Sequence, residues 1–213
     1  MNSVTFNNEH LSEFTPDTWD IDVNLYELNV RFLAGGASQS FTAFVLLEYY
    51  IAACQPQYVV ELGSQKGSLS VSIANHACAS EQFLFHTFEI DKATHWGNRI
   101  CGGVGHWFEK LETISPHCKS FELDAFGDEA QTIVRNNMAN YRTLIICDGG
   151  DKVREVREYG QFLKKGDMIM AHDFGTEIFD EDVPQDALNI TYHEPWNTRF
   201  VQYKTQFKTF IKL

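Results

Sequence analysis

The chain has 213 residues, of which 44% are hydrophobic and 14% aromatic, enough to bury the core of a single α/β domain. A formal net charge of −12, with the basic residues scattered along the chain, argues against nucleic acid as a partner. No apolar run approaches the roughly 18 residues that cross a bilayer, and the five cysteines form no C-x-x-C pair. We therefore expect a cytoplasmic protein with reduced thiols and no membrane partner.

The first part of the chain is polar and is followed by a long apolar run without a helix breaker. This run predicts a helix over 41–53 that packs against a sheet. The polar segment before it predicts an N-terminal arm at 1–40, which could cover an active site. The chain is thus expected to consist of this arm and one domain at 41–213.

From Tyr58 onward, short apolar runs rich in β-formers alternate with helical stretches, the pattern of a parallel sheet covered by helices on both faces. Strands are expected at 58–62, 83–89, 120–123, 143–147 and 167–171, with helices at 68–78 and 152–163. After Pro184, alternation predicts strands at 190–193, 199–203 and 207–212, with a turn at 196–198. The expected fold is α/β, Rossmann-like and doubly wound, a mostly parallel sheet with an antiparallel C-terminal edge hairpin.

A glycine-containing loop follows the first predicted strand. In it, Gly63 permits a tight turn where a cofactor approaches, Gly67 permits close packing of helix on strand, and Ser68 can cap the next helix. The carboxylate of Glu61 would attract a cationic amino group and repel a pyrophosphate, and the glycine spacing of dinucleotide sites is absent. We expect Glu61, Gly63, Ser64, Gly67 and Ser68 to bind a cofactor that carries an amino acid. The alternative is that the two glycines serve only an ordinary strand-to-helix turn.

Acidic residues also end the second and third predicted strands. Glu89 is placed to accept the hydroxyls of a ribose, with Asp91 as the fallback for this role. Asp124 can bond an adenine amino group while Phe126 supplies an apolar wall. The alternative for Asp124 is an ordinary surface acid at the end of a strand.

In this order, the acid-glycine loop and the two strand-end acids resemble the class I S-adenosylmethionine-dependent methyltransferases over 57–172. The chain also resembles, more specifically, the O-methyltransferases related to cephalosporin hydroxylase and the macrolide-sugar and rhamnosyl O-methyltransferases. This narrower resemblance is carried by 36–40, by 61–68, and by Asp148-Gly149-Gly150-Asp151 together with 159–167. It implies S-adenosylmethionine as the cofactor of the glycine loop.

The fourth and fifth predicted strands end in Asp148 and in His172-Asp173, so these side chains should face one crevice. In the resembled families, acids at these strand ends hold magnesium, a pattern that Asp148 and Asp173 match. His172 stands where a second carboxylate is usual, which makes manganese, iron or zinc as compatible as magnesium. If a metal binds, Asp148, His172 and Asp173 are its expected ligands; if none binds, His172 or Asp151 is the expected general base. Lys152 is expected to steady an acceptor oxygen or to be a solvated surface group.

The expected activity is therefore methylation of a hydroxyl on a small molecule or sugar, with Asp148, Asp151 and His172 at the reaction centre. A second possibility is methyl transfer to nitrogen, but no Asn/Asp-Pro-Pro-Tyr motif follows the fourth predicted strand. A third is a non-catalytic binding or assembly protein that retains the fold, because a fold does not determine function. The residues do not predict the oligomeric state or the identity of the acceptor.

Overall fold

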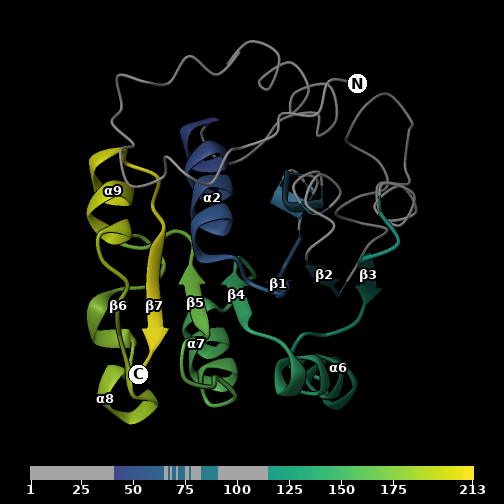
Figure 1. The fold of residues 1–213 in the computed structure, drawn as a ribbon. Coiled ribbons are helices and arrows are strands. Elements are labelled where there is room, and N and C mark those ends of the chain that lie inside the picture. Colours follow the sequence, from purple (N-terminus) through teal and green to yellow (C-terminus); the bar gives the residue numbers. More distant parts are fainter. Residues whose placement is uncertain are drawn as a thin grey trace, which may run out of the picture.

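A computed structural model describes residues 41–64, 67, 69–70, 72–74, 77, 83–90 and 115–213. The predicted arm at 1–40 lies outside the described residues, as do Ser68 and Asp91. The described residues form a seven-stranded sheet in the order β3-β2-β1-β4-β5-β7-β6 (Figure 1). Its strands are β1 (Tyr58–Leu62), β2 (Leu84–Glu89), β3 (Cys118–Glu122), β4 (Thr143–Cys147), β5 (Met168–Ala171), β6 (Ile190–Tyr192) and β7 (Lys208–Lys212).

Strands β1 to β5 pair in parallel, whereas β7 pairs antiparallel with both β5 and β6. The strand order runs outward in both directions from the β1–β4 pair, which is the topological switch point of the sheet. The predicted doubly wound, mostly parallel sheet with an antiparallel C-terminal edge is confirmed.

Helices cover both faces of the sheet, so the central strands are buried on both sides. The helices are α2 (Phe41–Cys54), α6 (Asp128–Asn140), α7 (Lys152–Gly160), α8 (Gln185–Leu188) and α9 (Trp196–Gln202), with a 3-10 turn at Asp180–Asp182. In β1, Tyr58, Val60 and Leu62 pack in the core beneath α6 and α7, while Val59 packs in the core beneath α2. The described residues between 69 and 77 are helical, in agreement with the predicted helix there. None of the described helices combines the length and the apolar character that a membrane crossing requires.

The strand predicted at 199–203 and the turn predicted at 196–198 are wrong, because this segment forms helix α9. Trp196 and Phe200 lie four residues apart and bury the same helix face against Tyr50 of α2, with ring centroids 5.3 and 5.9 Å from that of Tyr50. The Asn197 side chain exchanges hydrogen bonds with the backbone of Thr209 at 2.8 Å. Packing against α2 and β7 therefore decides the conformation of a segment whose local pattern suggested a strand.

Candidate active site

The residues that follow β1, β4 and β5 meet at the carboxyl edge of the sheet. Parallel pairing aligns Leu62 with Cys147 and Cys147 with Ala171, so the next residues of the three strands are neighbours. Backbone hydrogen bonds extend this alignment, from Asp148 N–H to Leu62 O at 3.0 Å and from His172 N–H to Cys147 O at 3.1 Å. The predicted convergence of these strand ends is confirmed.

The two glycines of the loop after β1 both have positive φ angles, 84° at Gly63 and 74° at Gly67. A Cβ atom at Gly63 would lie 2.2 Å from the Cα of Gly149, so two backbones approach each other here. The predicted tight turn is present, and the backbone that follows β4 uses the space left by the missing side chain. Ser64 is buried, and its hydroxyl donates to Phe88 O at 3.5 Å.

Glu61, in β1, is fully buried. Its Oε2 accepts hydrogen bonds from the Ser70 hydroxyl and from the Thr87 hydroxyl, the latter at 2.6 Å. Its Oε1 has no hydrogen-bond partner among the described residues. Burial raises the pKa of the Glu61 carboxyl to about 8, although the hydrogen bonds from Ser70 and Thr87 oppose the shift. An oxygen without a partner at this depth fits a ligand that brings a hydrogen-bond donor or a positive charge.

Glu89 ends β2 beside β1 and is mostly buried, with its Oε1 accepting from Ile90 N–H at 3.0 Å. Asp124 is exposed after β3, and its Oδ1 accepts from Phe126 N–H at 2.9 Å. The Arg154 guanidinium lies 3.9 Å from the centroid of the Phe126 ring. Both acids therefore lie on the β2–β3 side of Glu61, and their ligand roles stay predictions.

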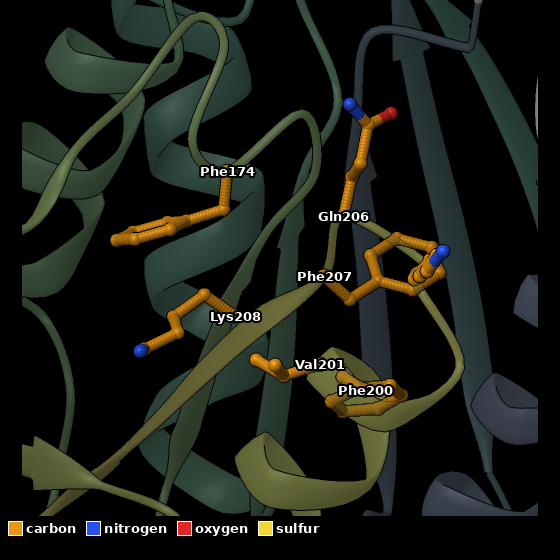
Figure 2. A pocket seen from close by; sticks show the side chains of 7 residues that line it. Phe174, Phe200, Val201, Gln206, Phe207 and Lys208 are labelled. Atoms are coloured by element: carbon orange, nitrogen blue, oxygen red, sulfur yellow. The ribbon is translucent and has the colours of Figure 1, made fainter.

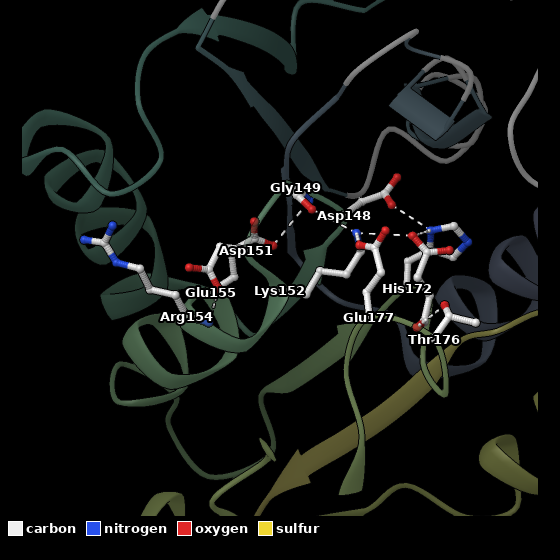
Figure 3. A network of polar contacts seen from close by, with 10 residues as sticks. Asp148, Gly149, Asp151, Lys152, Arg154, Glu155, His172, Thr176 and Glu177 are labelled. Atoms are coloured by element: carbon white, nitrogen blue, oxygen red, sulfur yellow. Dashed lines mark hydrogen bonds and ion pairs between the residues drawn. The ribbon is translucent and has the colours of Figure 1, made fainter. Parts of the chain in front are cut away.

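Three of the predicted site residues form one polar cluster (Figure 3). The Nδ1 atom of His172 lies 2.7 Å from Asp148 Oδ1 and 3.4 Å from Asp173 Oδ2. One potential ligand atom from each of these residues lies within 4.8 Å of the others. Asp148 and His172 are buried, and burial raises the pKa of the Asp148 carboxyl while its contact with His172 opposes this.

Lys152, the first residue of α7, is also part of this network. Its side chain is only 5% exposed, so the surface role considered for it is wrong. The ammonium donates to Gly149 O at 2.9 Å and to Glu177 Oε2 at 2.7 Å, and it lies 3.2 Å from Asp173 Oδ2. Burial lowers the pKa of the Lys152 ammonium, but the contacts with Glu177 and Asp173 outweigh this effect and leave it raised.

Two further acids differ from the sequence expectation. Asp151 is exposed and caps α7, because its Oδ1 accepts from Arg154 N–H at 3.0 Å; the structure does not include it in the polar cluster. Glu155, which was not predicted, is buried, and its Oε2 accepts from Gly149 N–H at 3.3 Å. Burial raises its pKa to about 8. The only sequence signal for Glu155 was its position one helical turn after the cap.

The cluster has the donor atoms of a metal site but also contains a cation. Asp148, His172 and Asp173 converge as ligands would, yet His172 Nδ1 is paired with Asp148 and the Lys152 ammonium lies beside Asp173. A divalent ion bound to Asp173 would lie close to this ammonium, which is electrostatically unfavourable. The predicted ligand roles stay a prediction, but the arrangement fits a resident divalent ion poorly.

A cavity of about 350 Å³ is lined by side chains from the loop after β5, from α9 and from the start of β7 (Figure 2). It adjoins the polar cluster through Phe207, whose ring centroid is 4.9 Å from that of His172. Its walls combine aromatic rings with polar side chains, from Phe174, Phe200, Val201, Lys204, Gln206, Phe207 and Lys208. The cavity therefore offers an apolar surface with two cationic groups beside the polar cluster.

No protein-family model matches the chain. No curated protein matches it either. Among solved structures, it is similar to CmcI with S-adenosylhomocysteine (SAH), with a TM-score of 0.54 and 9% identity over 100% of this chain and 94% of that one. A Klebsiella pneumoniae protein described as an O-methyltransferase aligns with a TM-score of 0.51 and 15% identity, over 97% of this chain and 96% of that one. The SAH-bound Podospora anserina methyltransferase PaMTH1 aligns with a TM-score of 0.51 and 13% identity, over 81% of this chain and 74% of that one. The chain therefore has the fold of the class I methyltransferases, as the resemblance predicted.

Proposed function

We propose that the protein is an S-adenosylmethionine-dependent O-methyltransferase that acts on the hydroxyl of a small molecule or sugar. The observation that carries this proposal is Glu61, a buried carboxyl at the switch point of the sheet with one oxygen lacking a partner among the described residues. A ligand bearing an ammonium group would complete the hydrogen bonding of this oxygen. The similarity to methyltransferase structures crystallised with SAH supports the same cofactor class.

The donor would lie along the carboxyl ends of β1, β2 and β3. Glu61 would accept from its amino group, Glu89 from its ribose hydroxyls and Asp124 from its adenine amino group. The backbone at Gly63, Ser64, Gly67 and Ser68 would form the turn around it. When bound, S-adenosylmethionine supplies an electrophilic methyl group on a sulfonium.

His172 is the group best placed to take the acceptor's proton. A hydrogen bond from His172 Nδ1–H to Asp148 Oδ1, at 2.7 Å, would leave Nε2 as the basic nitrogen. Asp148 would orient the imidazole and stabilise its charged form. The cavity lined by Phe207 would receive the acceptor, holding its hydroxyl close to the methyl carbon. No step in this proposal passes through a metal.

Calorimetric titration with S-adenosylmethionine and SAH tests the donor site, using wild type, Glu89→Ala and an exposed control, Glu181→Gln. We expect micromolar binding that Glu89→Ala weakens by at least about tenfold and Glu181→Gln leaves unchanged, because only Glu89 lies at the proposed ribose site. Absence of binding to the wild type would contradict the proposal.

Transfer of a labelled methyl group to a panel of hydroxyl and amine acceptors then tests the chemistry. We expect transfer to oxygen that falls by about 100-fold or more in His172→Asn, because a general base contributes this much. Transfer to amines alone would indicate an N-methyltransferase. Donor binding without any transfer would favour a non-catalytic binding protein.

A further inference from the structure

Lys152 differs from an ordinary helix-start lysine in that every donor of its ammonium has an acceptor. The three acceptors are Gly149 O at 2.9 Å, Glu177 Oε2 at 2.7 Å and Asp173 Oδ2 at 3.2 Å. An ammonium has three N–H donors, so these contacts saturate it. With 5% of the side chain exposed, water offers little alternative to them.

The acceptors come from two segments at the edge of the sheet, one after β4 and one after β5. Gly149 follows β4 and Glu177 belongs to the loop after β5 (Figure 3), and Asp173 lies in the same loop as Glu177. Asp173 Oδ2 is shared, since it lies 3.2 Å from Lys152 Nζ and 3.4 Å from His172 Nδ1. The ammonium therefore neutralises the carboxylate that a metal at this cluster would need as a ligand.

We propose that the Lys152 ammonium is a built-in counter-cation that takes the place of a divalent metal at the Asp148–His172–Asp173 cluster. Magnesium or manganese would need the oxygens of Asp148 and Asp173 as ligands, and the ammonium beside Asp173 would repel either ion. Lys152 also ties the loop after β5 to the start of α7 through Glu177 and Asp173. The cluster of this chain consequently works with a fixed positive charge in place of an exchangeable one.

Binding of Mn²⁺ alone tests this inference, measured by calorimetry and by electron paramagnetic resonance of free Mn²⁺. The proteins are wild type, Lys152→Met, Lys152→Gln and Lys152→Arg. Glutamine keeps hydrogen-bond donors but removes the charge, and arginine keeps the charge. A matched control, Lys164→Met, removes a lysine whose ammonium lies 3.8 Å from Asp167, on the loop that precedes β5. Circular dichroism and urea unfolding check that each variant folds.

We expect wild type, Lys152→Arg and Lys164→Met to bind Mn²⁺ no better than at millimolar strength. Lys152→Met and Lys152→Gln should bind it at least about tenfold more tightly, because a like charge beside the ligands is gone. Adding Asp173→Asn should abolish that gain. Micromolar binding by the wild type, or no gain in the folded variants that lack the charge, would overturn the inference. Although it concerns the site of the proposed methyl transfer, the test reads metal binding only, so the two proposals fail independently.

Discussion

Replacing Glu61 by glutamine removes a buried titrating group with little change in shape. Burial raises the pKa of Glu61 to about 8 from its usual 4.5. The unfolded chain releases this proton near pH 4.5, whereas the folded protein holds it until about pH 8. The stability that comes from the retained proton is therefore complete below pH 4.5 and is lost as the pH rises toward 8.

The size of this loss follows from the pKa difference. Between about pH 5 and pH 8, wild type should lose roughly 3 kcal/mol of unfolding free energy through Glu61, at about 1.4 kcal/mol for each pH unit. The glutamine variant lacks this loss. Its amide oxygen can still accept from Ser70 and Thr87, and any change in these hydrogen bonds does not depend on pH and cancels when the two pH values are compared.

Urea unfolding at both pH values measures the effect for wild type, Glu61→Gln and the exposed control Glu181→Gln. We expect the stability of Glu61→Gln relative to wild type to rise by about 3 kcal/mol from pH 5 to pH 8, and that of Glu181→Gln to change by less than about 0.5 kcal/mol. A pH-independent difference for Glu61→Gln, or one that moves in favour of wild type as the pH rises, would refute the reasoning.

Three further predictions concern neighbouring residues. Gly63→Ala should lower the unfolding free energy by at least about 2 kcal/mol, because its Cβ would meet Gly149 at a positive φ, whereas Gly150→Ala, which meets nothing within 4 Å, should change it little; urea midpoints compare the two. Asp151→Ala should cost about 1 kcal/mol through loss of the helix cap, and Asp151→Ser should restore stability with full methyl transfer; loss of transfer in a stable Asp151→Ser variant would assign the base to Asp151. Affinity for S-adenosylmethionine should increase as the pH is raised toward 8, by up to about tenfold for each pH unit, because the cation binds the ionised form of Glu61. Calorimetry should show a weaker pH dependence in Glu61→Gln.

Much of the fold could be predicted because the central strands are short apolar runs bounded by turn residues. The predicted strands at 58–62 and 143–147 agree with β1 and β4, whose residues are all buried. The local sequence pattern failed to predict elements whose apolar residues are few. Helix α6 was not predicted, since it is mostly polar and buries only Ala130, Val134 and Met138 along one stripe.

The position of the candidate site could also be inferred from the chain alone. Parallel strands share a carboxyl edge, so acids that follow β4 and β5 must meet once the strands are adjacent. Adjacency of β4 and β5 alone therefore predicts that Asp148, His172 and Asp173 lie together. The glycine at 63 was equally evident as a turn residue, although only the fold shows that Gly149 is the neighbour that requires it.

The tertiary structure alone decided the electrostatic character of the site. Burial and pairing of these side chains depend on segments that are distant in the chain. Lys152 is buried because the loop after β5 brings Asp173 and Glu177 to it. One oxygen of Glu61 has no partner among the described residues because Ser70 and Thr87 both donate to the other oxygen. The identity of a residue specifies the charge it can carry. Its solvation and its partners, which set the free energy of that charge, arise only when the strands and loops are packed together.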